Sequence, residues 1–333
     1  MITLEVIAKK AGVSVSTVSK ALNGYAVISE ETRNLVTRVA EELGYTPNAN
    51  AQSLVKKRAN TIGVVYEVQY GLKNLFFSAV MEAFRRNVQE QGFDILLLSN
   101  NTENKLDYLK HCVSKNVDAV LIVSVGEAPY ESIKKLQESD LAVIMLDPPV
   151  LGNNTVYSDS YLGIKDSCSY LYNLGHRRIA FLNGSYENFI GKERFEGYLD
   201  FMKEKELEPL YIGDVSNESY TFDEGYETMK ALYKKYGIVD AICSVSDLMA
   251  MGAMAFLREK GLKVPDDVSI IGFDDLSVCE LASPPLTTIA QDYENIGKKA
   301  SDLILKMLET GERIVDPIIV RTSLVVRDSC KKR

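Results

Sequence analysis

A short segment near the start of the chain places hydroxyl groups and one lysine on the same side of a predicted helix. At about 100° per residue, residues 15 to 22 divide into two arcs. The first arc holds Val15, Ser16, Ser19 and Lys20, and the second holds Thr17, Val18, Ala21 and Leu22. The second arc suits packing against other helices, which leaves the first free to hydrogen-bond to base edges. The segment is therefore typical of a helix that contacts DNA.

A second candidate for DNA contact follows in the run PNANAQSLVKK, residues 47 to 57. Pro47 is allowed in the first turn of a helix, but about ten helical residues are fewer than the roughly 12 to 15 that an isolated helix needs in water. We therefore expect the segment to order only when it docks against a partner. An exposed leucine on a docked helix, here Leu54, can enter between base steps and kink the duplex. The alternative is a flexible linker.

Helix caps and stop signals predict the elements that position these residues. Thr3 and Ser14 can each cap a short helix, and Gly12 marks the turn between the two helices. Ser29 can cap a third helix that ends at Gly44. Apolar residues recur along this third helix at helical spacing: Leu35, Val36, Val39, Ala40 and Leu43. Three short helices in this order predict a helix-turn-helix unit.

The charge distribution agrees with this prediction. Up to Asn60, eight Lys and Arg residues against five Glu residues give a net charge of +3, and because the whole chain carries −8, the remainder carries −11. A basic head on an acidic body suits a protein that presents one end to phosphates. A small helical bundle with a solvated basic face would show the same charges and is the alternative.

Beyond residue 60, apolar strand-like runs alternate with amphipathic helices. In the first half, strands are expected to begin at Ile62, Asp94, Ala119 and Ala142, and helices to span residues 76–91, 105–115 and 130–138. After Asp159, helices are expected at 162–174, 193–205, 223–235 and 248–259, and strands at 179–184, 210–215, 241–246 and 268–273. The pattern predicts an α/β core of two doubly wound lobes with parallel sheets, and a ligand cleft at the carboxyl ends of the strands.

Composition narrows the class of protein. A chain of 333 residues with 46% apolar residues can bury two lobe cores and a small head. Its sequence has no apolar run long enough to span a bilayer and no basic-plus-apolar leader, so a cytoplasmic protein is expected. The five cysteines are odd in number and form no CxxC pair, which argues against a disulfide or zinc framework.

Signals for catalysis are weak. The chain has two histidines, no glycines spaced as GxG and no GxxxxGK[ST] run, so the fingerprints of nucleotide binding are absent. His176, in the GHRR turn, suits a structural hydrogen bond better than acid or base work. We therefore predict no catalytic residues, no metal ligands and no cofactor. An enzyme would need residues that only folding brings together.

Several motifs in a consistent order make the chain resemble the bacterial regulators of the lactose-repressor and galactose-repressor family over essentially all 333 residues. These motifs are AGVSVSTVSKALNG, SEETRNLVTRVAEELGYTPNANAQSL, GHRRIAFLNG, RFEGY, VPDDVSIIGFDD and PPLTTIAQD, beginning at Ala11, Ser29, Gly175, Arg194, Val264 and Pro284. The resemblance implies a helix-turn-helix domain at 1–46, a hinge helix and linker at 47–60, and a periplasmic-binding-protein-like effector and dimerisation core at 61–333. Its chain would cross between lobes three times, with the first lobe at about 61–158 and 290–320 and the second at about 159–289 and 321–329.

The resemblance also implies which residues bind DNA. Base readout is expected from Val15, Ser16 and Lys20, since lysine can donate to guanine O6 and N7. The full set of expected DNA contacts is Thr3, Val15, Ser16, Thr17, Ser19, Lys20, Asn23, Ser29, Asn48, Ala51, Gln52 and Leu54. Gln52 stands where many relatives have Arg, which would remove one phosphate contact and weaken affinity at high salt.

An effector site is implied in the core. The expected contacts are Phe76, Phe77, Asp147, Asn188, Arg194, Tyr220, Ser246, Asp247 and Asp274. This is the chemistry of a polyol site, because carboxylates accept from adjacent hydroxyls, arginine donates, and aromatic rings stack on the apolar face of a pyranose.

Two departures bear on the choice of effector. Purine-responsive relatives carry an Arg and a Thr at positions that match Asn188 and Ile190, so a sugar or sugar phosphate is preferred over a purine. Ser246 replaces the Asn that often precedes Asp247, so the hydrogen bonds to the ligand are less predictable.

The function expected from all of this is repression of a carbohydrate-utilisation operon by a homodimer that binds a pseudo-palindromic operator. A sugar or sugar phosphate between the lobes would shift the population of ordered hinge helix. The alternative within the same fold is a global catabolite regulator whose co-effector is a phosphorylated carrier protein. A sugar-binding or enzymatic protein without DNA function is a third class, against which the intact Thr3 to Leu54 pattern argues. No heptad tail follows the last strand-like run, so a tetramer built on a terminal coiled coil is not expected.

Overall fold

The computed structural model describes residues 2–46, 58–66, 74–98, 107–123, 130–147, 152–184, 189–212 and 220–333. The chain divides into two units, a headpiece at Met1–Asn60 and a core at Thr61–Arg333. Each unit is described by itself.

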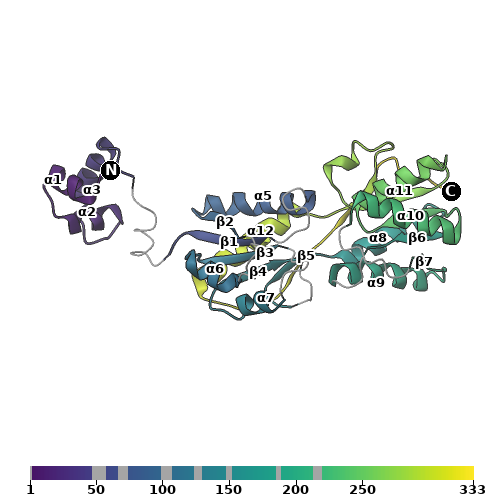
Figure 1. Ribbon diagram of the computed structural model, residues 1–333, viewed down its shortest axis with the longest axis horizontal. Coiled ribbons are helices and arrows are strands. Elements are labelled where there is room, and N and C mark those ends of the chain that lie inside the picture. The colour runs from purple at the N-terminus through teal and green to yellow at the C-terminus, as the bar shows by residue number, and fades with distance from the viewer. Residues whose placement is uncertain are drawn as a thin grey trace. The chain divides into compact units, whose positions relative to one another are not determined.

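In the described part of the headpiece, residues 2–46, three helices pack together (Figure 1). They are α1 at Leu4–Ala11, α2 at Val15–Leu22 and α3 at Glu30–Glu42. One buried side chain from each helix, Ile7, Val18 and Val36, is completely shielded from solvent. Gly12 has φ of 67°, a left-handed conformation that glycine adopts without steric cost, and it turns the chain from α1 into α2. The helix-turn-helix prediction is confirmed.

Two of the three predicted helix caps form. Ser14 Oγ accepts from the backbone N–H of Thr17 at 3.0 Å, and Ser29 Oγ accepts from that of Thr32 at 3.3 Å. Thr3 occupies the N-cap position of α1, but its side chain makes no capping hydrogen bond, so that prediction was wrong. The N–H of Val6 donates instead to the backbone carbonyl of Thr3 at 3.1 Å, which leaves the hydroxyl without the usual donor.

The first lobe of the core is a six-stranded parallel sheet in the order β11-β5-β4-β3-β1-β2. Its strands are β1 Thr61–Tyr66, β2 Asp94–Leu98, β3 Ala119–Val123, β4 Ala142–Leu146, β5 Thr155–Ser158 and β11 Ile318–Val320. Its helices are α5 Leu75–Glu90, α6 Tyr108–Ser114, α7 Tyr130–Gln137 and α12 Tyr293–Thr310. Buried side chains form one hydrophobic cluster with α5 and α12 and another with α6 and α7. These helices therefore cover both faces of the sheet, as the continuous apolar strands require.

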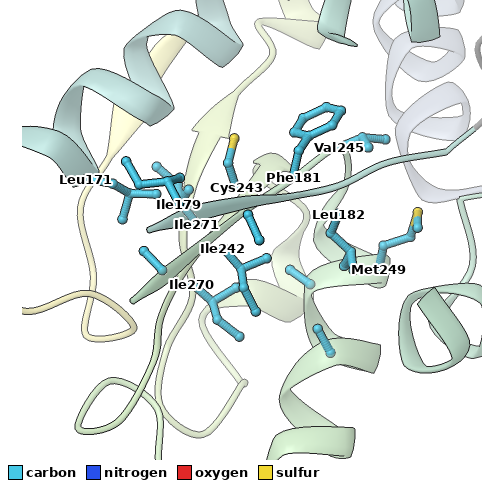
Figure 2. Packing of buried hydrophobic residues seen from close by; sticks show 14 of the residues in the cluster. Leu171, Ile179, Phe181, Leu182, Ile242, Cys243, Val245, Met249, Ile270 and Ile271 are labelled. Carbon is cyan, nitrogen blue, oxygen red and sulfur yellow. The ribbon is translucent and has the colours of Figure 1, made fainter. Parts of the chain in front are cut away.

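The second lobe repeats the arrangement in the order β12-β10-β9-β8-β6-β7, with only β12 antiparallel to its neighbour among the strands described. Its strands are β6 Ile179–Leu182, β7 Leu210–Tyr211, β8 Ala241–Ser244, β9 Ser269–Asp274, β10 Thr287–Ala290 and β12 Ser323–Val325. Its helices are α8 Ser160–Asn173, α9 Phe189–Glu204, α10 Phe222–Tyr236, α11 Asp247–Glu259 and the short 3₁₀ helix η2 Ser277–Cys279. Figure 2 shows part of this core, where Ile242 of β8 and Ile270 of β9 are paired in the sheet and lie side by side.

Three segments join the two sheets: one between β5 and α8, one between β10 and α12, and one between β11 and β12. Each sheet is thus built from chain segments far apart in the sequence. Strand β5 had no counterpart among the predicted strands, because TVYS is a four-residue run next to turn residues and lacks the length of the other apolar runs.

Among the helices described, none is long and apolar enough to cross a membrane. All five cysteines are free thiols, and four of them are buried. Within the described residues, no group of three or more His, Cys, Asp or Glu side chains is arranged to hold a metal ion.

Candidate DNA-binding face and effector site

Helix α2 presents the predicted polar arc to solvent. Val15 is 42% exposed, and Ser16 and Lys20 are exposed, whereas Val18 and Ala21 are buried against α1 and α3. The prediction that one arc packs while the other stays free is confirmed. A helix with a lysine, a hydroxyl and a small apolar side chain on its free face can contact base edges in a major groove.

Other residues predicted to contact DNA have local structural roles. Thr17 Oγ1 lies 2.8 Å from Ser14 Oγ within the cap of α2, and Asn23 Nδ2 donates to the carbonyl of Ser19 at 2.8 Å. Ser29 caps α3, as described above. Asn48, Ala51, Gln52 and Leu54 lie outside the described residues.

Arg194 is the centre of the candidate effector site. It lies on α9, in the second lobe, and is only 5% exposed. Its Nε donates to Ser160 Oγ at 3.2 Å, its Nη1 donates to the carbonyl of Val245 at 2.8 Å, and its Nη2 lies 4.0 Å from Asp274 Oδ1. The guanidinium carbon lies 4.1 Å from the centre of the Phe273 ring and 5.9 Å from that of Tyr220.

Two aspartates of the site adopt left-handed backbone conformations, although neither is glycine. Asp147 follows β4 with φ of 50°, and Asp274 ends β9 with φ of 120°. Such conformations cost free energy and persist where the surrounding structure imposes them, typically at binding sites. Asp274 also accepts from Gln291 Nε2 at 2.6 Å.

Burial dominates the electrostatics of these carboxyls. Burial raises the pKa of Asp147 to about 6, although the positive charge of Arg194 opposes the shift. Burial raises the pKa of Asp274 to about 8; Arg194 opposes this shift and the charge of Asp247 adds to it. With a pKa of about 8, Asp274 holds a proton at neutral pH and can donate as well as accept, whereas Asp147, with a pKa of about 6, is mostly ionised at pH 7.

Asp247 lies under the site rather than in it. The residue is completely buried, its Oδ2 accepts from the backbone N–H of Leu276 at 2.8 Å, and its Oδ1 accepts from Thr288 Oγ1 at 2.5 Å. Ser246 Oγ caps α11 by accepting from the N–H of Met249 at 3.3 Å. Asp247 therefore supports the loop after β9, and Ser246 supports the start of α11. Both were predicted effector contacts, and both side chains have protein partners in this structure.

The first lobe contributes a pocket with an apolar wall and a polar edge. Phe76, Phe77, Val80, Leu146, Asp147, Val156, Tyr157, Ser158, Gln291 and Ile296 line it. Ser158 is 4% exposed, and its Oγ has no hydrogen-bond partner among the described residues. A buried hydroxyl without a partner costs free energy, so it marks a place where a ligand group can bind.

Tyr220 has φ of 50° and contacts Gly184 closely. A Cβ at Gly184 would lie 2.3 Å from the Tyr220 ring, so only glycine allows the ring to lie against the end of β6. Asn188 lies outside the described residues, and Ile190 is buried in α9 at 5% exposure.

Sequence reasoning missed Ser158 and Gln291. Gln291 follows β10, where the chain passes back to the first lobe, and it both lines the pocket and donates to Asp274. Its place in the run TTIAQD, at the end of a strand, was the available signal, since ligands bind at the carboxyl ends of parallel strands. Ser158 had no such signal because β5 itself was not predicted.

The raised pKa values predict that the core loses stability as pH rises from about 4 to about 8. A carboxyl whose folded pKa lies above its usual value of 3.8 retains a proton that the unfolded chain has lost. The contribution is therefore complete below about pH 3.9 and is lost as pH rises through about 8 for Asp274.

We expect urea unfolding of the wild-type chain to show a lower free energy at pH 8.5 than at pH 7. Asp274→Asn should reduce this difference, because an amide does not titrate while it can still accept from Gln291. Asp302→Asn, on the exposed face of α12, is the matched control and should keep the wild-type slope. An unchanged slope in Asp274→Asn would assign the pH dependence to other groups.

Comparison with known proteins agrees with both parts of the chain. The model of the bacterial regulatory proteins of the lacI family matches residues 3–48, and that of the periplasmic binding protein-like domain matches residues 168–330. The HTH-type transcriptional repressor PurR of Vibrio campbellii is 31% identical over 344 residues, which span 100% of this chain and 99% of the relative. The HTH-type transcriptional regulator DegA of Bacillus subtilis is 31% identical over 334 residues, 98% of this chain and 97% of the relative.

Solved structures show the same fold. The lac repressor dimer bound to operator and the anti-inducer ONPF has a TM-score of 0.85 at 24% identity and covers 99% of both chains. The cellobiose complex of the transcriptional regulator CelR has a TM-score of 0.73 at 29% identity and covers 99% of this chain and 100% of that chain. Because relatives above 30% identity span the full chain, this chain belongs to the lacI family of transcriptional repressors, which bind operator DNA and small-molecule effectors as dimers and are not enzymes.

Proposed function

We propose that this chain represses a carbohydrate-utilisation operon and responds to a sugar bound between the two lobes of its core. The observation that carries the proposal is the chemistry of the candidate site. Asp147 follows β4 and Asp274 ends β9, so both lie at the carboxyl end of a strand. Arg194 of α9 faces Asp274, and Asp147 lines the pocket together with the aromatic rings of Phe76 and Phe77. Carboxylates, a donor and aromatic rings together fit a ring that has hydroxyls on its edge and apolar faces.

A residue in the first turn of α9 favours a sugar over a purine as the effector. Ile190 is buried in α9 and offers no hydrogen bond, whereas purine-responsive members carry Thr at the matching position. The CelR structure, which has a similar fold, is a cellobiose complex. Both points support a carbohydrate effector for this chain.

On the DNA side, we propose that a homodimer in the cytoplasm places α2 of each headpiece in successive major grooves of a pseudo-palindromic operator. Residues 47–60 would act as hinge and Leu54 as the wedge between base steps. Effector binding would change the population of the DNA-binding state by its differential affinity for the two arrangements of the lobes.

The experiment that tests this function combines operator selection with an effector screen. Operator fragments would be selected from random duplex DNA with the full chain, and binding would then be measured by gel shift in the presence of neutral sugars, sugar phosphates, hypoxanthine and guanine. We expect one sugar class to change operator affinity by roughly 5-fold to 150-fold, the usual range of allosteric coupling. A response to a purine and to no sugar would overturn the proposal.

Lys20→Ala is expected to weaken binding to the selected operator by roughly tenfold or more. Lys20 is exposed on the free face of α2, where lysine can donate to guanine or to phosphate oxygens. Loss of a base contact would also relax selection at one operator position, which sequencing of the selected pool would detect.

Arg38→Ala removes the same charge from the exposed side of α3 and serves as the control. It should change affinity much less than Lys20→Ala. Equal effects of the two substitutions would mean that overall charge, and not the position of Lys20, determines binding.

A further inference from the structure

Among the residues that the structure describes, carboxyl groups outnumber cations around the candidate effector site. Asp147 and Asp247 both raise the pKa of Asp274, and Arg194 is the cation that lowers the pKa of both Asp147 and Asp274. Arg327 lies beside Asp275, the residue after Asp274, and its Nη1 is paired with Asp275 Oδ1 at 2.8 Å. An anionic ligand would add negative charge to a buried site in which burial and neighbouring carboxyls already disfavour it.

Arg194 does not present a free fork for a phosphate. Its Nε and Nη1 donate to Ser160 and to the carbonyl of Val245, and its Nη2 edge faces Asp274. One face of the guanidinium lies over the Phe273 ring. Bidentate phosphate recognition needs two parallel N–H groups from one edge, so this arginine is oriented as an internal support with one edge toward the carboxylate.

Helix α10 begins beside Tyr220, and helix α11 begins beside Val245, whose carbonyl accepts from Arg194. Both helices have acidic side chains in their first turns. Helix α11 is capped by Ser246 and has Asp247 in its first turn. Helix α10 is closed by a capping box between Thr221 and Glu224, with Asp223 also in the first turn. Helix N-termini bind phosphate when their N–H groups are free. Here Ser246 accepts from the N–H of Met249 and Thr221 from that of Glu224, and an acidic side chain in the same turn of each helix would repel an anion.

The described lining of the first-lobe pocket contains hydrogen-bond acceptors and neutral groups and no lysine or arginine. Its polar edge consists of Asp147, Ser158 and Gln291, and the remaining described lining is aromatic or aliphatic apart from the hydroxyl of Tyr157. The buried Ser158 Oγ has no partner among the described residues, and a ligand hydroxyl would satisfy it.

We infer that the effector is an uncharged polyhydroxy compound, an unphosphorylated sugar or sugar alcohol, whose hydroxyls bind Asp147, Asp274 and Ser158. The inference rests on the proposed sugar response and narrows it, because it excludes sugar phosphates. Arg194 then orients Asp274 instead of binding an anion.

The test compares parent sugars with their own phosphates on the full chain. Thermal shift and calorimetry would use glucose with glucose 6-phosphate, galactose with galactose 1-phosphate, ribose with ribose 5-phosphate, and maltose, cellobiose and mannitol as further neutral probes. We expect at least one neutral probe to bind at concentrations up to about 10 mM, and its phosphate, where paired, to bind at least roughly tenfold more weakly.

Two variants distinguish charge from shape. Asp147→Asn removes one negative charge and should narrow the affinity gap between a sugar and its phosphate, whereas Ser158→Ala should weaken the neutral sugar roughly tenfold and leave the gap unchanged. Gly152→Ala, remote from the pocket lining, is the control and should change neither value.

Tighter binding of a phosphate than of its parent sugar would overturn the inference while the proposed sugar response stands. Binding of guanine or hypoxanthine, with no sugar bound, would overturn the proposed function itself. Failure of every neutral probe to bind at about 10 mM also counts against an uncharged effector.

Discussion

Arg194→Ala is expected to lower the free energy of unfolding of the core by about 2 to 5 kcal/mol, because two buried partners lose a charged donor, and to abolish the response of operator binding to effector. The substitution leaves Asp274 buried without its nearby cation and leaves Ser160 and the carbonyl of Val245 without a donor. Urea unfolding and gel shift with effector measure the two effects. Binding to operator without effector should persist, because the headpiece is a separate unit.

Lys192→Ala on the same helix is the control for this substitution. Lys192 is exposed and lies 3.7 Å from the exposed Glu196, a pair of the kind that contributes little to stability. We expect Lys192→Ala to lower the free energy of unfolding by less than about 0.5 kcal/mol. A loss in Arg194→Ala as small as in the control would mean that Ser160 and the carbonyl of Val245 obtain other hydrogen-bond donors in the variant.

The second large effect is expected from Gly252→Ala. Helices α10 and α11 lie in direct contact, and a Cβ at Gly252 would lie 2.0 Å from the carbonyl oxygen of Phe222 and 2.6 Å from the backbone nitrogen of Tyr226. Backbone atoms cannot rotate away as a side chain can, so the two helices must separate. We expect a loss of at least about 3 kcal/mol, at or above the upper end of the usual cost of overpacking.

Gly152→Ala provides the matched comparison, since a Cβ there would meet nothing within 4 Å and the residue does not adopt a positive φ. Its effect on urea unfolding should stay within about 0.5 kcal/mol. If Gly252→Ala were equally neutral, the close approach of α10 and α11 would not be a requirement of the fold.

The headpiece was predictable because its signals are local. A cap, a turn glycine and apolar residues at helical spacing all act within a few residues of one another, and they predicted the order and the buried faces of α1, α2 and α3. Thr3 shows the limit of such signals. Its residue type suits a cap, yet the geometry of the first turn satisfies the N–H of Val6 through the backbone.

The lobes were predictable as alternating elements, but strand order was not. Periodicity along the chain shows that a run is buried and says nothing about its neighbour in the sheet. The pairing of β11 with β5, and of β12 with β10, joins segments more than thirty residues apart. Because β10 lies in the second lobe and β11 in the first, the chain passes between the lobes after β10, in the segment that contains Gln291.

By itself, the sequence determined the classes of the elements, the exposed face of α2 and the types of side chain available to an effector. Only the tertiary structure decided which of them act together. Asp247 and Asp274 look equivalent in sequence, but the N–H of Leu276 and the hydroxyl of Thr288 hold Asp247 beneath the site, whereas Asp274 faces Arg194. The reason is physical: burial, charge balance and free hydrogen-bonding capacity depend on which atoms surround a side chain, and distant segments of the chain supply most of those atoms.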